Sequence, residues 1–197
     1  MTIAQEAASW FAPPAVELSP APKPGEKAPS CPQLPLPAAN GKPTIISFLR
    51  HCGCPIAEAA FLNLRTAASK HPDINFIAVS HSDQPSTDRW VESVGDRGND
   101  GANQVEVIVD AERKIYAQWG LGLSSWGHVL SPSGLASVWK LGRERGIWNR
   151  PTESGTRWQL SGNWVVDDEG VVRGGGPAER VDEVMDFEEA VGLVKRS

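Results

Sequence analysis

Residues 44–70, TIISFLRHCGCPIAEAAFLNLRTAASK, are the part of the chain from which the fold can be predicted. A short apolar run at residues 44–49 is typical of a buried strand, and a compact polar turn with Cys52 and Cys54 follows it. Pro55 suits the first position of a helix, because its missing N–H would be unsatisfied there in any case. The apolar residues after it recur mostly at helical spacing. The stretch therefore predicts a strand, a turn with two thiols and a helix.

The predicted turn places both thiols where a negative charge is favoured. Unpaired N–H groups and the dipole at the N-terminus of a helix stabilise a thiolate, which is the reactive form of cysteine. A free cysteine is often only a small buried apolar residue, but two of the three cysteines lie one residue apart here, beside Arg50 and His51. We therefore predict catalytic roles for Cys52, Cys54, His51 and Arg50.

Metal binding is a weaker interpretation of this turn. Cys52 and Cys54 supply two ligands, and a structural zinc site needs four. The third cysteine and the four histidines do not form a motif with ligand spacing. The sequence therefore predicts neither a metal nor another cofactor.

The strand, the cysteine turn and the helix resemble the thioredoxin superfamily. Within it, GEKAPSCPQLP at residues 25–35 and GKPTIISFLRHCGCPIAEAAFLNL at residues 41–64 resemble the peroxiredoxin-like AhpC/TSA proteins, especially fungal members with a similar RHCGCP turn. The resemblance extends from about residue 25 to the C-terminus. It implies a thioredoxin-like α/β fold, with a central mixed sheet flanked by helices, and a thiol-dependent redox activity.

The turn departs from both cysteine patterns of that superfamily. On the thioredoxin pattern WCxxC, His51 stands at the Trp position, Cys52 at the first Cys and Pro55 at the second. On the peroxiredoxin pattern TxxC, Cys52 stands at the Thr and Pro55 at the peroxidatic Cys. Cys54 has no strict counterpart in either pattern. A disulfide within a CxC turn would close a tight ring, whose strain makes the bond easy to reduce.

The composition indicates an ordinary globular protein. At 197 residues, with 40% hydrophobic residues and a net charge of −5, the chain is long enough for one domain with its own core. An acidic balance without basic clusters argues against nucleic acids and anionic membranes as partners. No apolar run approaches the about 18–20 residues of a membrane span, and residues 1–12 lack the basic region of a secretory signal. Because three cysteines do not make a disulfide framework, we expect a reducing, cytoplasmic location.

Residues 13–43 contain ten prolines. This density excludes a helix and limits strand pairing, so an extended surface segment is predicted. We expect a flexible arm at residues 1–24 and the thioredoxin-like domain at residues 25–197. Cys31 is either an auxiliary thiol near the turn or an inert side chain.

Further apolar runs and turn signals predict the remaining elements. Strands are expected at residues 74–80, 105–110, 163–167 and 171–173, the last two as a hairpin. Helices are expected at residues 85–94, 111–119, 132–145 and 187–194. Residues 121–161 are too long for a plain connection between two core strands. They are therefore predicted to form an insertion over the active edge of the sheet.

The insertion holds half of the eight tryptophans. They either pack the insertion onto the core or line a pocket for an apolar organic substrate, with Trp126 and Trp158 in its wall. His81 follows the second strand, at the edge where ligands gather in open α/β sheets. It is predicted either to face the thiols or to have a capping or structural role in the loop.

The resemblance adds three positions before the hairpin. Gly162 stands at the position where thioredoxins carry a cis-proline. By spacing along the sequence, Ser161 is nearest to the position of the peroxide-binding arginine of peroxiredoxins. Arg157 is the nearby candidate to replace that arginine. The predicted substrate-binding residues are therefore Ser161, Gly162, Arg157, Trp126, Trp158 and His81.

Three functional hypotheses remain open. The first is a peroxiredoxin-like redox enzyme, in which Cys52 or Cys54 attacks a hydroperoxide or disulfide and the other sulfur resolves it. Its partners would be a small-molecule substrate and a thiol reductant, thioredoxin or glutathione. The second is a non-redox enzyme acting on a small organic metabolite, which the resemblance links to fungal specialised biosynthesis. The third is a non-catalytic binding module. The resemblance also implies a homodimer.

Overall fold

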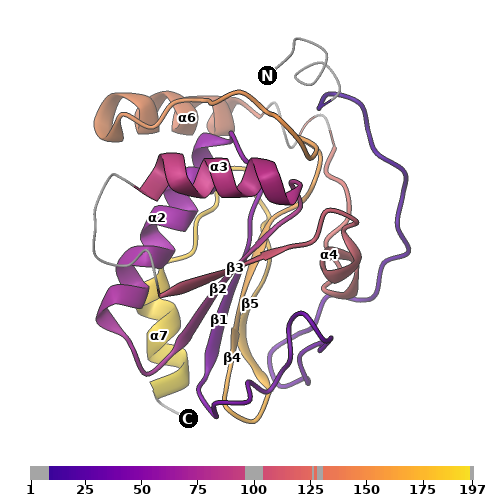
Figure 1. Ribbon diagram of the computed structural model, residues 1–197, viewed down its shortest axis with the longest axis vertical. Helices are drawn as coiled ribbons and strands as arrows, with labels where there is room; N and C mark the ends of the chain where they lie inside the picture. The colour runs from indigo at the N-terminus through magenta and orange to yellow at the C-terminus, as the bar shows by residue number, and fades with distance from the viewer. Residues whose placement is uncertain (1–8, 96–103, 126, 128–130, 196–197) are drawn as a thin grey trace.

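In the computed structural model, which describes residues 9–95, 104–125, 127 and 131–195, a mixed five-stranded sheet forms the centre of the molecule. The strand order is β3-β2-β1-β4-β5 (Figure 1). The strands are β1 (Thr44–Phe48), β2 (Asn75–Ser80), β3 (Val105–Val109), β4 (Gly162–Val166) and β5 (Val172–Pro177). The helices are α2 (Pro55–Lys70), α3 (Gln84–Gly95), α4 (Lys114–Gln118), α6 (Pro132–Arg145) and α7 (Phe187–Lys195). The predicted α/β architecture is confirmed. None of the helices in these ranges is long and apolar enough to cross a membrane.

The strand directions bring the cysteine turn to one edge of the sheet. β1, β2 and β3 are parallel, whereas β4 pairs antiparallel with β1 and β5. Gly162 at the start of β4 lies opposite Phe48 at the end of β1. The carboxyl ends of the three parallel strands and the beginning of β4 therefore share one edge, here called the thiol edge. Ligands gather at such an edge in open α/β sheets.

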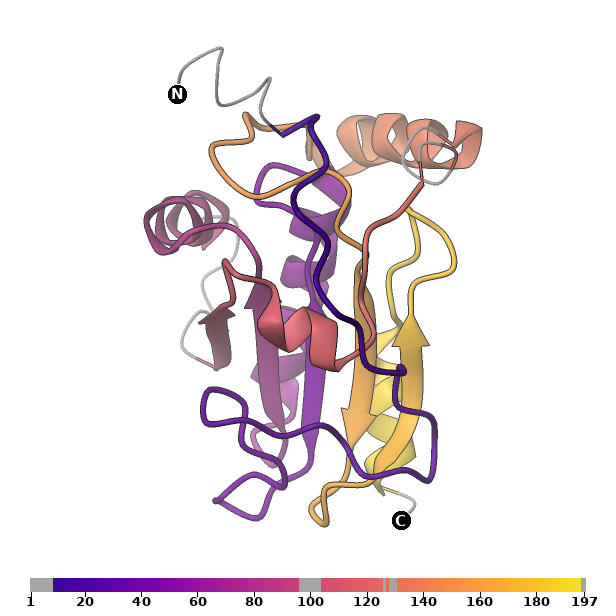
Figure 2. The same cartoon turned by 90° about the vertical axis from the view of Figure 1, so that its right-hand side faces the viewer.

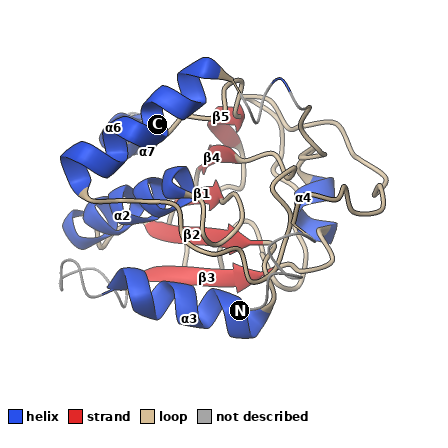
Figure 3. Ribbon diagram, turned by 90° about the horizontal axis from the view of Figure 1, so that it is seen from above, coloured by secondary structure: helices blue, strands red, loops and turns tan. Residues whose placement is uncertain are grey.

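Both faces of the sheet are covered by other elements. All five residues of β1 are buried, as expected for a central strand between two layers. On one face, α2, α3 and α7 enclose a cluster that includes Leu64 and Trp90. On the other face lies α4, on the opposite side of the sheet from α2 and α7 (Figure 3). There, α4 and the proline-rich segment cover Phe48 and Trp164, whose ring centroids are 5.5 Å apart.

The helix predicted at residues 111–119 is shorter in the structure. The carboxylate of Asp110 accepts hydrogen bonds from the backbone N–H groups of Lys114 at 2.9 Å, Ile115 at 2.7 Å and Tyr116 at 3.0 Å. Such a carboxylate satisfies the unpaired N–H groups at the start of a helix. Because Asp110 caps residues further along the chain, α4 begins at Lys114 and a turn precedes it.

The segment before residue 25, for which a flexible arm is predicted, makes long-range hydrogen bonds to the rest of the domain. From residue 9 on it lies along the α4 face of the molecule (Figure 2). The N–H of Ser19 donates to the carbonyl oxygen of Ala117 at 3.0 Å, and the indole Nε1 of Trp164 donates to that of Pro22 at 3.1 Å. These long-range hydrogen bonds hold an extended segment in place. Its sequence has no local periodicity from which this position could be predicted. Residues 1–8 lie outside the described residues.

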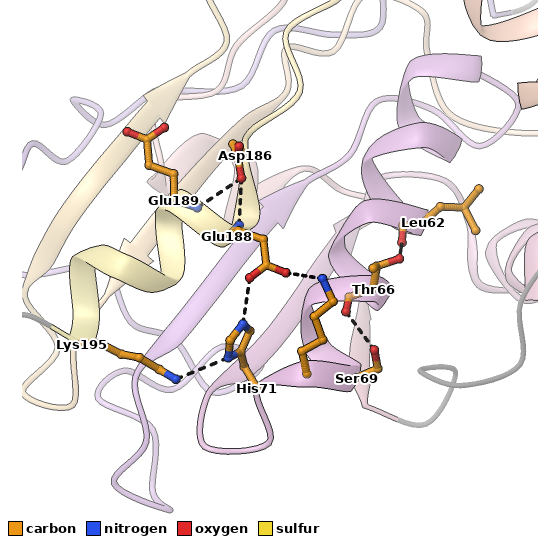
Figure 4. A network of polar contacts seen from close by, with 9 residues as sticks. Leu62, Thr66, Ser69, His71, Asp186, Glu188, Glu189 and Lys195 are labelled. Carbon is orange, nitrogen blue, oxygen red and sulfur yellow. Dashed lines mark hydrogen bonds and ion pairs between the residues drawn. The ribbon is translucent and has the colours of Figure 1, made fainter. Parts of the chain in front are cut away.

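A surface network joins α2 to α7 at the end of α2 far from the thiols (Figure 4). Glu188 pairs with Lys70 at 2.7 Å and with the Nε2 of His71 at 3.0 Å. Asp186 accepts hydrogen bonds from the backbone N–H groups of Glu188 and Glu189 and so caps α7. Exposed ion pairs contribute only about 0–1 kcal/mol each, so the apolar contacts beneath them dominate the docking of α7.

Candidate functional site

A tight turn carries the two thiols at the amino end of α2. The N–H of Cys54 donates to the carbonyl oxygen of His51 at 3.1 Å, and Cys54 is the N-cap residue of α2. Between the cysteines, Gly53 has a φ of +113°, in the region that favours glycine. Pro55 is the first residue of the helix. The predicted succession of strand, cysteine turn and helix is confirmed.

Part of the predicted insertion lies directly on this turn. Residues 149–157, here called the strap, begin with a hydrogen bond from the N–H of Arg150 to the carbonyl oxygen of Gly53, at 2.9 Å. The guanidinium of Arg150 also donates to both carboxylate oxygens of Glu58, from Nε at 2.7 Å and from a terminal nitrogen at 3.2 Å. Glu58 is buried in the first turn of α2. This two-point ion pair fixes the strap over the thiols.

Cys52 lies in a cluster of hydroxyl groups. Its N–H donates to the Oγ of Ser82 at 3.2 Å, and its Sγ lies 3.5 Å from the Oγ of Ser80 and 3.9 Å from the Oγ1 of Thr87. Burial raises the pKa of the Cys52 thiol, and the hydroxyl groups of Ser82, Ser80 and Thr87 lower it only in part. The prediction that the turn favours a thiolate is therefore wrong for Cys52, because the side chain is only 5% exposed and a buried charge is disfavoured.

Arg50 and His51 are both buried beside the turn, but only Arg50 is a source of positive charge. A terminal nitrogen of Arg50 donates to the carbonyl oxygen of Arg157 at 2.9 Å. The pKa of His51 is well below its ordinary value, because of burial and then because of the nearby Arg50, Arg157 and His81. His51 is therefore neutral at pH 7. Neither of its ring nitrogens has a hydrogen-bond partner among the described residues.

The two thiols line two separate cavities at the thiol edge. The first, here called the Cys54 cavity, has a volume of about 250 Å³ and is lined by Trp10, Arg50, His51, Cys54, Pro55, Ile56, Gly134, Leu135, Val138, Asn149, Arg157 and Val181. The second, here called the Cys52 cavity, has a volume of about 290 Å³ and is lined by Cys52, Ser86, Arg89, Trp90, Ser93, Arg150, Pro151 and Glu153. In the part of the chain that the structure describes, no group of three or more His, Cys, Asp or Glu side chains is arranged to hold a metal.

The Cys54 cavity combines apolar walls with two buried guanidinium groups. Arg157 is held in place from three sides: its Nε donates to the Oγ of Ser9 at 3.0 Å, a terminal nitrogen donates to the Oγ1 of Thr152 at 3.1 Å, and its guanidinium lies 4.7 Å from the ring centroid of Trp10. Arg50 provides the second charge. A thiol beside such groups is suited to reactions in which negative charge develops.

The predicted tryptophan pocket has a different composition in the structure. Trp158 is buried, donates from Nε1 to the carbonyl oxygen of Trp10 at 3.0 Å and packs edge-on against that ring. It lines neither the Cys54 nor the Cys52 cavity, whereas Trp10 lines the first. Trp158 therefore serves to pack the insertion, and it holds the tryptophan that borders the cavity. Trp126 lies outside the described residues.

Three other predicted substrate-binding residues lie near the cavities without lining either of them. His81 is buried, and its Nε2 lies 3.2 Å from the N–H nitrogen and 3.1 Å from the carbonyl oxygen of Thr156 in the strap. Burial is the main cause that lowers the pKa of His81 to about 4. Gly162 pairs with Phe48 in the sheet, and the carbonyl oxygen of Ser161 accepts a hydrogen bond from the N–H of Ala178. Of the predicted set, the cavities therefore include Arg157, Cys52, Cys54, His51 and Arg50.

Cys31 lies at the opposite end of the sheet from the other two cysteines. Its segment is flanked by the bridge between Lys27 and Val171 and by the packing of Pro37 against Gly170, both at the turn between β4 and β5. The thiol edge lies at the other end of β4 and β5. The hypothesis that Cys31 acts as an auxiliary thiol at the cysteine turn is therefore wrong for this conformation.

Several residues of the site were missed by reading the sequence. Ser80, Ser82 and Thr87 surround Cys52, and Glu58 holds the strap through Arg150. A signal existed for the first two, because they are polar residues at the carboxyl end of a buried strand. The Arg150–Glu58 pair joins positions that are 92 residues apart, so no local sequence pattern predicts it.

Residues 62–173 match the model of a family described as AhpC/TSA antioxidant enzyme. The match covers more than half of the chain. This protein belongs to the AhpC/TSA family. Membership supports a thiol-dependent redox function at a coarse level. The matched residues begin after the cysteine turn, so the roles of Cys52 and Cys54 depend on the geometry of this AhpC/TSA protein itself.

Solved structures share the fold of this AhpC/TSA protein at low identity. A thiol peroxidase from Chromobacterium violaceum has a TM-score of 0.57 and 14% identity, over 92% of this chain and 91% of that one. A peroxiredoxin-like protein from Aquifex aeolicus has a TM-score of 0.57 and 18% identity, over 92% of this chain and 96% of that one. The predicted thioredoxin-like fold is confirmed. A search of curated proteins finds no match.

Proposed function

We propose that this AhpC/TSA protein is a thiol-dependent hydroperoxide reductase, in which Cys54 attacks the peroxide and Cys52 resolves the product. One observation carries the proposal: the thiol at the amino end of α2 lines a cavity that also contains Arg50 and Arg157. A helix N-terminus and two guanidinium groups favour both a thiolate and the charge that develops on the peroxide oxygens. The family of the protein agrees with this chemistry.

The proposed reaction begins in the Cys54 cavity. The Cys54 thiolate attacks the terminal oxygen of the hydroperoxide, the O–O bond breaks, and a sulfenic acid forms on Cys54. The leaving alkoxide takes up a proton, which replaces the one lost by the Cys54 thiol, and departs as an alcohol. The sulfur of Cys52 then attacks the sulfenic acid, a disulfide forms, and the hydroxyl group leaves as water with the Cys52 proton. The two thiols have supplied the two electrons.

The environments of the two thiols support this division of roles. Cys52 has a raised pKa and lies among neutral hydroxyl groups. Cys54 instead lies beside two guanidinium groups. Apolar side chains from three elements, including Ile56, Leu135 and Val181, line the same cavity and fit the organic part of a hydroperoxide better than they fit water.

The proposal is tested by the intact mass of the reduced protein before and after one equivalent of cumene hydroperoxide. We expect the wild type to lose two hydrogens and Cys52→Ser to gain one oxygen. The rate of reaction of Cys54→Ser should be lower than that of the wild type by about 100-fold at least. Hydrogen peroxide in a parallel series should react more slowly than cumene hydroperoxide, because it makes no contact with the apolar wall. Unchanged mass in the wild type, or full reactivity of Cys54→Ser, would contradict the proposal.

A non-redox enzyme is the second candidate, and the unpartnered neutral imidazole of His51 favours it. A neutral buried imidazole beside an apolar cavity is suited to act as a base on a small organic molecule. In that case hydroperoxide would leave the thiols unchanged, whereas aromatic metabolites would alter the fluorescence of Trp10. A Trp10→Phe variant would assign that signal to the Cys54 cavity.

A further inference from the structure

We infer that the Cys52 cavity is the entrance for the reductant, and that this reductant is a low-molecular-weight thiol. The inference rests on the proposed function, since it concerns the disulfide that the proposed reaction leaves. It assigns the two half-reactions to two cavities, the Cys54 cavity for the oxidant and the Cys52 cavity for the reductant.

Among the residues that the structure describes, none lines both cavities. α3 supplies one wall of the Cys52 cavity, through Ser86, Trp90 and Ser93, whereas α6 supplies one wall of the Cys54 cavity. Figure 2 shows α3 and α6 on either side of the first turns of α2. The strap contributes residues to both cavities. A molecule in one cavity therefore meets a different sulfur from a molecule in the other.

The chemistry of exchange favours attack on Cys52. In thiol–disulfide exchange the sulfur that is not attacked leaves as a thiolate, and the more stable thiolate leaves faster. Attack on Cys52 releases Cys54, at the amino end of α2 and in the cavity of Arg50 and Arg157. Attack on Cys54 would instead release a buried Cys52 among neutral hydroxyl groups. The cavity that leads to Cys52 therefore leads to the productive reaction.

The access to Cys52 fits a small thiol and not a protein thiol. Cys52 is 5% exposed, and the strap above the turn is held by the ion pair between Arg150 and Glu58. The cysteine of a protein reductant needs a sulfur at the surface, whereas the cavity of about 290 Å³ admits a small molecule. Trp90 lines this cavity and is buried.

The exchange consumes two small thiols. The first, as a thiolate, attacks the Sγ of Cys52; the Cys52–Cys54 bond breaks and Cys54 leaves as a thiolate. The second attacks the sulfur of the small thiol in the resulting mixed disulfide. Cys52 is released and takes up a proton, and the two small thiols leave as their own disulfide. They have supplied two electrons to the protein.

The test uses full-length protein oxidised with diamide, so that it does not depend on peroxide reactivity. The rate of disulfide reduction is followed by intact mass with glutathione and, in parallel, with thioredoxin at equal thiol concentration. Ser93→Phe fills the Cys52 cavity from an exposed position of α3. Ser69→Phe, the same change on an exposed position at the far end of α2, is the matched control.

We expect glutathione to reduce the wild type faster than thioredoxin does, and Ser93→Phe to slow glutathione by about tenfold. Ser69→Phe should behave as wild type both in reduction by glutathione and in oxidation by cumene hydroperoxide. Faster reduction by thioredoxin, equal rates in Ser93→Phe and Ser69→Phe, or no Cys52–Cys54 disulfide after diamide would overturn the inference. Failure of oxidation by hydroperoxide with normal reduction by glutathione would overturn the proposed function alone.

Discussion

Gly53, between the two cysteines, is the residue on which the closeness of turn and strap depends. Its φ of +113° disfavours any side chain, and a Cβ there would lie 2.9 Å from the carbonyl oxygen of Arg150 and 3.0 Å from that of Pro151. Both contacts are with backbone atoms, which cannot rotate away. The glycine therefore allows the strap to cover the thiols.

Gly53→Ala should lower the free energy of unfolding by about 2–4 kcal/mol, because left-handed strain adds to a backbone clash. Urea denaturation measures this. Gly41→Ala is the matched control, since Gly41 has a φ of +68° and a Cβ added there would meet nothing within 4 Å. It should cost only the strain of about 1–2 kcal/mol. Equal losses in the two variants would show that the strap does not press on the turn.

At the scale of elements, α2 connects the site to the core. α2 contributes Leu64 and Ala68 to the buried apolar cluster on its face of the sheet. Its first turn carries Glu58, which is buried and paired with Arg150 of the strap. The pair is asymmetric, because the side chain of Glu58 is 2% exposed and that of Arg150 is 30% exposed. Replacing Arg150 and replacing Glu58 should therefore lower the free energy of unfolding by different amounts.

Arg150→Met should lower the free energy of unfolding by about 3 kcal/mol, because it leaves a buried carboxylate without its partner. Glu58→Gln should cost about 1 kcal/mol, because Arg150 reaches water and the amide still accepts a hydrogen bond. Thermal or urea denaturation of both variants and of the double variant gives the coupling energy. A larger loss in Glu58→Gln than in Arg150→Met would contradict this account.

Across the described part of the molecule, His51 and His81 are both buried at the thiol edge, and both are neutral at pH 7. Burial lowers the pKa of His51 well below its ordinary value and that of His81 to about 4. In the unfolded chain both titrate near the ordinary pKa of 6.5. The unfolded state therefore binds more protons than the folded state below pH 6.5.

The free energy of unfolding should accordingly be highest above pH 6.5 and decrease as the pH falls from 6.5 towards 4, where His81 becomes protonated in the folded state as well. Urea denaturation between pH 7.5 and 4.5 measures the slope. His81→Gln should be less stable at pH 7.5 but show a smaller slope. An equal slope in wild type and His81→Gln would contradict the assignment.

Local patterns in the chain are enough to predict the order of strands and helices and the cysteine turn at the start of α2, whereas the mixed sheet flanked by helices is what the family resemblance implies. The order of elements and the turn depend on local periods and on Pro and Gly, whose effects reach only a few residues along the chain. The positions of Cys52, Cys54, His51 and Arg50 at the thiol edge follow from that order, whereas Arg157 is a candidate through the resemblance to peroxiredoxins.

The charge states of these side chains and the groups that they face depend instead on tertiary contacts. Trp10 at the Cys54 cavity, Arg150 on Glu58 and the hydroxyl groups around Cys52 come from segments far apart in the sequence. The neutral state of His51 and the raised pKa of Cys52 follow from burial, which no local pattern contains. The physical reason is that the cost of a charge depends on all atoms around it, and folding brings those atoms together from the whole chain.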